Sequence, residues 1–211
     1  MQRASDTKFV VLHALRLKGL AETDTVASSA GIPADEVGAT LAALLDAALV
    51  SRRDGRLSGW SLTTEGRQAH DEALCAEVAR LGARPAVEGA YRRFLPLNRE
   101  ALAVCTDWQM HLEDGRTVLN DHRDAAYDRA VLDRLAAVHA EAEPLCRELA
   151  EAAPWFAGYG RRLGNALAQV QAGDFDWFTT PVIDSYHTVW FELHEDLLST
   201  LGIERSKEEP S

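Results

Sequence analysis

One stretch constrains this chain more than any other, namely residues 26–67, VASSAGIPADEVGATLAALLDAALVSRRDGRLSGWSLTTEGR. Gly31 separates two helical patterns, because glycine enters the left-handed conformation that ends a helix without strain. Pro33 suits the residue before a helix start, and the acidic residues after it favour the positive amino end of the next helix. The pattern therefore predicts a short helix over 23–30, a turn, and a longer helix over 35–48.

A two-stranded hairpin is predicted directly after these helices. One strand begins at Leu49, an Asp-Gly turn lies at 54–55, and residues 57–62 form the returning strand. Two helices around a tight turn, followed by a hairpin, are the pattern of a winged helix-turn-helix. Basic side chains near the hairpin turn can reach the phosphates of DNA, and three arginines lie there, Arg52, Arg53 and Arg56.

The end of this stretch resembles the strand–wing–strand–helix passage of MarR-like winged-helix regulators. The matching residues are Ala48-Leu49-Val50, Arg52, Leu62-Thr63 and Gly66-Arg67. The resemblance covers about the first third of the chain and implies a DNA-binding transcriptional regulator. Similar winged modules are appended to larger enzymes such as phosphoenolpyruvate-utilising dikinases. This second resemblance implies an alternative, an adaptor that binds a protein partner, for example a dikinase-type enzyme, rather than DNA.

The candidate DNA-contacting residues lie on both helices and around the hairpin turn: Ser28, Ala34, Asp35, Thr40, Arg52, Arg53 and Arg56. In a DNA reader, the first residues of the second helix meet base edges through Arg, Lys, Asn, Gln, Ser or Thr. Here only Thr40 is an uncharged polar reader, and the carboxylates of Asp35 and Glu36 would repel phosphates. This departure from the usual pattern keeps the adaptor alternative open.

The distribution of charge permits nucleic-acid binding without requiring it. The chain of 211 residues has a formal net charge of −11. Residues 1–75 hold 8 Lys and Arg against 10 Asp and Glu, whereas residues 76–211 hold 14 against 23. The acidic charge therefore lies mainly in the second part, and the predicted winged region is nearly neutral.

Several classes of protein receive no support from the sequence. Residues 1–8 are polar and no apolar run is long enough for a leader or a membrane span, so a cytoplasmic protein is expected. Cys75, Cys105 and Cys146 are odd in number and widely spaced, which is typical of reduced, buried thiols. No glycine-rich phosphate loop, activated nucleophile or zinc-ligand spacing is found, so we predict a non-enzyme without cofactor or metal.

The second part of the chain is predicted to be a separate helical domain. A break at residues 82–85 predicts a winged helix-turn-helix domain over 1–82 and a dimerisation and effector domain over 86–205. Four amphipathic helices favour an all-α bundle that forms a homodimer, with a polar loop over 111–123. Thr180-Pro181 is expected to open the last helix. The predicted fold class is therefore mainly α with one small β-hairpin.

A small-molecule effector is predicted to bind this helical domain. The second part is rich in tryptophan and carries polar groups within apolar helix faces, as an effector pocket requires. The candidate ligand-binding residues are Asp107, Trp108, Asn120, Trp177, Asp184, His187, Trp190 and His194. Two alternatives remain: the tryptophans fill the core while neighbouring groups satisfy buried histidines, or Asp184 and His187 contribute to a metal site.

Overall fold

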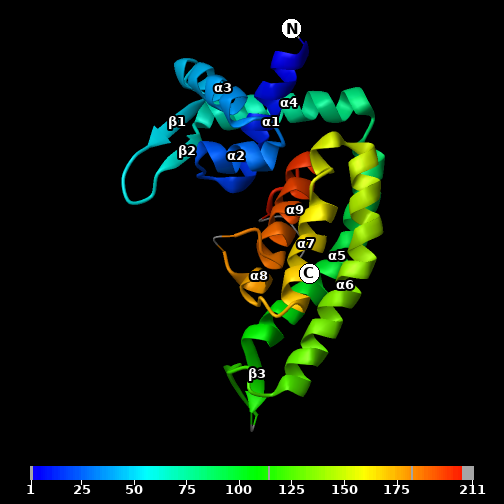
Figure 1. The fold of residues 1–211 in the computed structure, drawn as a ribbon. Helices are drawn as coiled ribbons and strands as arrows, with labels where there is room; N and C mark the ends of the chain where they lie inside the picture. The colour runs from blue at the N-terminus through cyan, green and yellow to red at the C-terminus, as the bar shows by residue number, and fades with distance from the viewer. Residues whose placement is uncertain (1, 114, 182, 206–211) are drawn as a thin grey trace. The chain divides into compact units, whose positions relative to one another are not determined.

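The computed structural model describes residues 2–113, 115–181 and 183–205, and the protein is mainly helical. The chain divides into two compact units, Met1–Gly82 and Ala83–Ser211. Figure 1 shows the elements of both units. Within the described ranges, none of the helices combines the length and the apolar composition that a membrane crossing needs.

The first unit consists of four helices and a hairpin: α1 (Gln2–Lys18), α2 (Thr23–Ala30), α3 (Ala34–Asp46), β1 (Val50–Arg53), β2 (Gly59–Leu62) and α4 (Thr64–Leu81). β1 pairs antiparallel with β2, with Val50 opposite Leu62. Ala21 and Trp60 exchange backbone hydrogen bonds of 3.0 and 2.8 Å, which ties the chain before α2 to β2. The predicted helices, turn and hairpin are therefore present.

Local sequence accounts for these elements. Gly31 has φ of 68° and ends α2, and its N–H bonds to the carbonyl of Ala27. The Thr63 side chain accepts a hydrogen bond from Gly66 N and so caps α4. Apolar side chains from every element except α4 form the core of this unit: Val11, Leu12, Leu15, Val26, Val37, Leu41, Leu44, Val50 and Leu62.

A pair of buried histidines joins α1 to α4. His13 Nδ1 lies 3.1 Å from His70 Nε2, and His70 Nδ1 lies 3.0 Å from the carboxylate of Asp71. The ring of Phe9 stacks on both imidazoles. His70 has no exposed surface. Its burial, together with the neighbouring His13, lowers the pKa of His70 from 6.5 to about 4.

We expect the first unit to lose stability as the pH falls from 6.5 toward 4. Because folding lowers the pKa of His70, the folded state binds this proton less readily than the unfolded chain. The stabilisation is therefore complete above the unfolded pKa and is lost below it, by about 3 kcal/mol in total. Hydrogen exchange of the α1 and α4 amides as a function of pH measures this loss. His70→Phe should flatten the profile, and an unchanged profile would contradict the role of His70.

The second unit is built on two long helices, α5 (Arg84–Gln109) and α6 (Ala125–Ala152), joined by the hairpin β3 (Met110–Glu113) and β4 (Arg116–Leu119). The chain continues through η1 (Pro154–Phe156), α7 (Tyr159–Gln171), α8 (Asp176–Thr179) and α9 (Tyr186–Leu201). α5 and α6 lie side by side (Figure 1) and are bridged by Arg93–Glu148 and Glu100–Arg134 ion pairs. Buried side chains of α9 and α7 complete the core.

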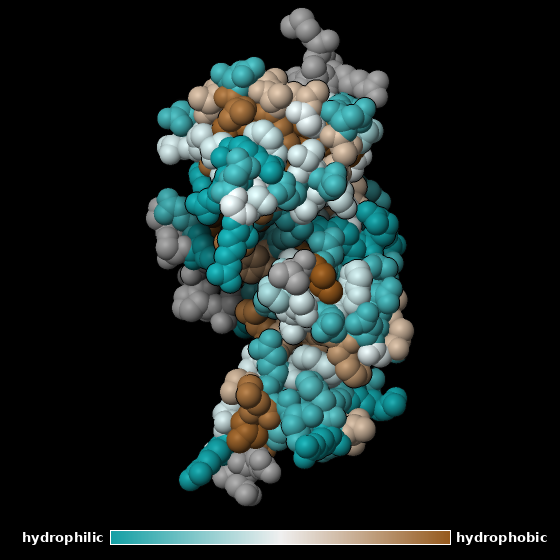
Figure 2. All heavy atoms as spheres, turned by 60° about the vertical axis from the view of Figure 1, so that its left-hand side comes forward, coloured by the Kyte–Doolittle hydropathy of each residue, from teal (hydrophilic) through white to brown (hydrophobic). Residues whose placement is uncertain are grey.

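The second unit differs from the all-α prediction. The segment predicted as a polar loop over 111–123 contains the β3–β4 hairpin. Apolar and polar residues alternate over Met110–Glu113, and Gly115, which precedes β4, adopts φ of 76°. One face of this hairpin carries Leu112 and Leu119, which are 75% and 77% exposed. Figure 2 shows hydrophobic side chains gathered at this end of the unit.

Two other predictions need correction. The last helix begins at Tyr186 rather than at Thr180-Pro181, because the Ser185 side chain accepts a hydrogen bond from Thr188 N and caps it. Cys75 is exposed rather than buried. The other two cysteines are enclosed in the second unit, and burial raises the pKa of each thiol to about 12.

Candidate nucleic-acid interface

The surface that helix α3 presents to solvent consists mostly of small and acidic side chains. Its first turn after Pro33 contains Asp35, which is exposed, and Glu36, whose carboxylate accepts a hydrogen bond of 2.8 Å from the Thr7 hydroxyl. The predicted polar reader, Thr40, donates its hydroxyl proton to the carbonyl of Glu36 at 2.8 Å. The exposed residues of α3 are Ala34, Asp35, Ala39, Ala42, Ala43, Leu45 and Asp46. None of them has a hydrogen-bond donor in its side chain.

Arg52 is held within the first unit. Its guanidinium lies 2.7 Å from Glu22 Oε2 and 3.2 Å from Asp54 Oδ1. It also lies over the ring of Trp60, 5.3 Å from the centroid. The hydrogen bond to Glu22 raises the pKa of Arg52, and hydrogen bonds from Ser58 and Arg52 lower the pKa of Glu22. Arg52 therefore holds the β1–β2 hairpin to Glu22, next to α2, and has little freedom to reach a phosphate.

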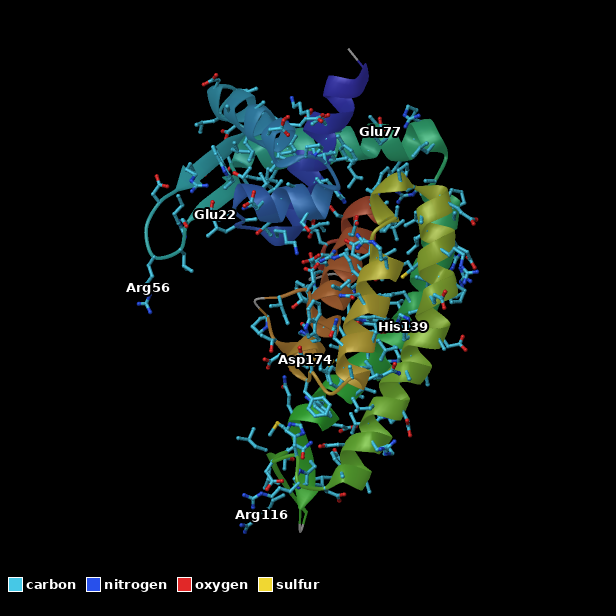
Figure 3. The ribbon with its side chains drawn as sticks, in the orientation of Figure 1. Glu22, Arg56, Glu77, Arg116, His139 and Asp174 are labelled. Carbon is cyan, nitrogen blue, oxygen red and sulfur yellow. The ribbon has the colours of Figure 1, made fainter. Side chains whose placement is uncertain are left out.

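Two arginines near the hairpin turn remain available. Arg53 and Arg56 are exposed, and neither has an ionic partner in the part of the chain that the structure describes. Figure 3 shows Arg56 at the tip of the β1–β2 connection, pointing away from the unit. Ser28 is exposed on α2. The basic part of the candidate interface therefore lies on the hairpin and not on α3.

The predicted ligand residues do not come together at one place. Asp107 Oδ2 is paired with Arg134 at 2.5 Å. Trp108 is buried in an aromatic cluster, and the ring of His122 lies 4.4 Å from it. The Asn120 amide donates to the Trp108 carbonyl at 3.1 Å. Asp107 therefore joins the end of α5 to α6, whereas Trp108 and Asn120 join it to the β4–α6 connection.

The remaining predicted ligand residues pack in or against the core of the second unit or form ion pairs near α9. Trp190 donates its indole N–H to Asn98 Oδ1 at 3.0 Å, and His194 packs on Phe94 and is 6% exposed. Trp177 packs partly buried against the same core. Asp184 is paired with Arg162. Burial lowers the pKa of His187, the last of the predicted ligand residues.

Asp184 and His187 do not form the pair that their spacing suggested. Asp184 precedes the cap of α9, so the two residues do not share a helix face. Within the described ranges, no group of three or more histidine, cysteine or acidic side chains is arranged to hold a metal ion.

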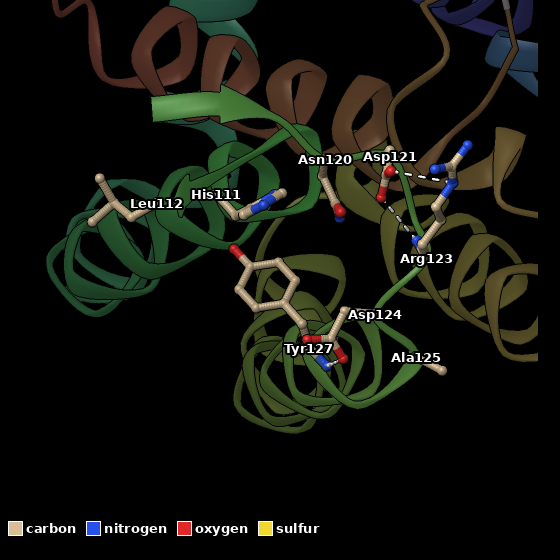
Figure 4. Close-up of a pocket in the computed structure, with 8 residues that line it drawn as sticks. All are labelled: His111, Leu112, Asn120, Asp121, Arg123, Asp124, Ala125 and Tyr127. Carbon is tan, nitrogen blue, oxygen red and sulfur yellow. Dashed lines mark hydrogen bonds and ion pairs between the residues drawn. The ribbon is translucent and has the colours of Figure 1, made fainter. Parts of the chain in front are cut away.

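A hollow of about 590 Å³ lies where β3, the β4–α6 connection and α6 meet. It is bounded by His111 and Leu112 of β3, Tyr127 of α6 and residues between Asn120 and Ala125 (Figure 4). Of the predicted ligand residues, only Asn120 lines it. The sequence signal for the β3–β4 hairpin was the alternation of apolar and polar residues over Met110–Glu113, followed by Gly115.

The chain was compared with protein families, curated proteins and solved structures. No family model, no curated protein and no solved structure matches the chain.

Proposed function

We propose that the first unit is a winged helix-turn-helix that binds duplex DNA, as a transcriptional regulator does. The order of its elements, with α2 and α3 around a glycine turn and the β1–β2 hairpin after them, supports this proposal. The observation that carries it is the presence of two exposed arginines, Arg53 and Arg56, on the hairpin, neither with an ionic partner among the described residues. Guanidinium groups in that position reach phosphates or the minor groove.

The surface of α3 determines what kind of DNA binding we propose. Its exposed alanines and carboxylates offer no hydrogen-bond donor to base edges. They could make only apolar contacts with thymine methyl groups or accept a hydrogen bond from cytosine. The binding energy should therefore come mostly from phosphate contacts of the hairpin. Such binding depends strongly on salt and discriminates weakly between sequences.

We expect the double variant Arg53→Ala, Arg56→Ala to bind a 25–30-base-pair duplex at least about 10-fold more weakly at low salt. The slope of log affinity against log salt should decrease by about 2, one for each phosphate contact removed. Fluorescence anisotropy with a labelled duplex measures both quantities. The matched control is Arg116→Ala, Arg123→Ala, which removes the same charge from exposed positions of the other unit. Equal effects of the two double variants would reject the hairpin as the contact.

A second function is favoured by the same α3 surface. A face of Ala39, Ala42 and Ala43 with Asp46 beside it lets another protein approach closely, and it suits an adaptor that binds a partner such as a dikinase-type enzyme. Ala42→Arg separates the two functions. It should strengthen DNA binding if α3 enters a groove, because it adds a cation there. It should abolish binding of a protein partner to this face, because it adds bulk and charge.

A further inference from the structure

Glu22 lies at the N-cap position of α2, but its side chain does not cap the helix. Its backbone is extended, as the position requires, and the carboxylate makes no capping hydrogen bond. Ser, Thr, Asp and Asn are preferred at such positions, because their short side chains accept a hydrogen bond from the first turn of the helix. The carboxylate of Glu22 instead contacts the β1–β2 hairpin, so capping does not account for a glutamate at this position.

The Glu22 carboxylate binds the guanidinium of Arg52 through both of its oxygens. Oε2 accepts a hydrogen bond from Nη1 at 2.7 Å, and Oε1 accepts one from Nη2 at 3.3 Å. Ser58, on the other side of the hairpin turn, also hydrogen-bonds this carboxylate. A two-point pairing of this kind fixes the orientation of the guanidinium as well as neutralising its charge. The remaining donor edge of Arg52 is used too, since its Nε lies 3.2 Å from Asp54 Oδ1.

Other contacts hold the hairpin in place without this ion pair. Ala21 and Trp60 exchange two backbone hydrogen bonds, and the Trp60 indole N–H donates to the Thr23 hydroxyl at 3.2 Å. The side chains of Arg52 and Glu22 are 31% and 45% exposed, and an ion pair as exposed as this contributes little to stability. Breaking the pair should therefore release Arg52 without detaching the hairpin from α2.

Arg52 lies on the face of the hairpin that Arg53 does not occupy. Arg52 is opposite Trp60 in the β1–β2 ladder, and its guanidinium lies over the Trp60 ring. Successive side chains of a strand point to opposite faces, so Arg53 belongs to the other face. A groove of duplex DNA has a phosphate backbone on each side, and a hairpin that enters it meets phosphates at both faces. A released Arg52 would therefore add a contact that Arg53 cannot make.

We propose that Glu22 is an autoinhibitory competitor for Arg52, because its carboxylate occupies the guanidinium that would otherwise bind a DNA phosphate. This inference rests on the DNA binding proposed for the first unit and adds a restraint to it. Carboxylate and phosphate both present oxygen acceptors to the same fork of N–H groups, so only one of them holds that fork at a time. An event that turns Glu22 away raises the number of available arginines on the hairpin from two to three.

Glu22→Ser in the full chain tests this proposal, because it removes the carboxylate and supplies a side chain that can cap α2. With the labelled 25–30-base-pair duplex, this variant should bind about 3- to 10-fold more tightly than the wild type. The slope of log affinity against log salt should increase by about 1, the value for one added phosphate contact. Arg52→Ala alone should change the affinity by less than about 2-fold, and it should remove the gain when it is combined with Glu22→Ser.

The matched control is Asp24→Ser, two positions further along the chain. Asp24 is exposed and has no ion pair among the described residues, so this variant removes the same charge without releasing Arg52. Its effect on DNA affinity should stay below about 2-fold. Equal gains in both serine variants, or unchanged or weaker binding in Glu22→Ser, would overturn the autoinhibition, while a loss in the Arg53 and Arg56 double variant would leave DNA binding standing. Absence of binding by the wild type and by Glu22→Ser would reject both proposals.

Discussion

Gly66→Ala is expected to unfold the first unit while the second unit stays folded. Gly66 lies in the first turn of α4, and a Cβ on it would lie 1.9 Å from the carbonyl oxygen of Leu49 and 2.9 Å from its carbonyl carbon. Both are backbone atoms, and the same oxygen accepts a hydrogen bond of 3.1 Å from Thr63 N. The chain cannot move away without breaking the junction between the hairpin and α4. A cost of about 4 kcal/mol or more follows, a large part of a small domain's stability.

Hydrogen exchange followed by mass spectrometry measures this effect in each unit separately. In Gly66→Ala, peptides from α1, α3 and α4 should lose protection, while peptides from α6 and α9 keep it. The matched control is Gly38→Ala in α3, where an added Cβ meets nothing within 4 Å. That variant should gain up to about 1 kcal/mol, because alanine favours a helix over glycine. Native protection in Gly66→Ala would show that the junction can yield.

Arg162→Met is expected to cost the second unit about 3–5 kcal/mol. Arg162 Nη2 lies 2.7 Å from Glu192 Oε2 and 2.9 Å from Asp184 Oδ1. Burial opposes the charge of Arg162, but its hydrogen bonds and the two carboxylates raise its pKa, so the charge is kept. The side chain of Glu192 is 5% exposed. Without Arg162 this carboxylate is left buried beside Asp196, which has no exposed surface.

The control for this variant is an arginine with an exposed partner. Arg93 pairs with Glu148 on the surface of α5 and α6, with side chains 54% and 53% exposed. Arg93→Met should cost at most about 1 kcal/mol, because water already screens that pair. Adding Glu192→Gln to Arg162→Met should restore part of the loss, since it removes the buried charge. Chemical denaturation measures all of these variants. Equal losses in Arg162→Met and Arg93→Met would mean that Glu192 reaches water.

Much of the first unit could be predicted because its signals are local. Gly31 ends α2 through its own backbone conformation, and Thr63 caps α4 through a residue three positions away. The hairpin follows from strand-forming residues around an Asp-Gly turn. The same rules apply to only half of the β3–β4 hairpin. Met110–Glu113 alternates before Gly115, but Arg116–Leu119 does not alternate, and the polar composition of 111–123 favoured a loop.

The candidate ligand site could not be predicted in the same way, because its members meet only through packing. Asp184 and His187 are three residues apart, yet the cap at Ser185 places Asp184 outside α9 and beside Arg162. His111 and Tyr127 are 16 positions apart and are brought together by the hairpin that returns the chain to α6. Spacing along a helix says nothing about such encounters.

The sequence by itself determined the order of the helices around the hairpin of the first unit and the end of α2 at Gly31, since a glycine in the left-handed conformation acts within a few residues of itself. The end predicted at residue 48 for the next helix was wrong, because α3 ends at Asp46. Only the tertiary structure decided what the charged and aromatic side chains do. It pairs Arg52 with Glu22, 30 positions away, and leaves Arg53 and Arg56 for solvent. It also uses Trp190 to satisfy Asn98 inside the core rather than to line a pocket. The physical reason is that an ion pair or a buried hydrogen bond depends on distance in space, which the order of residues does not contain.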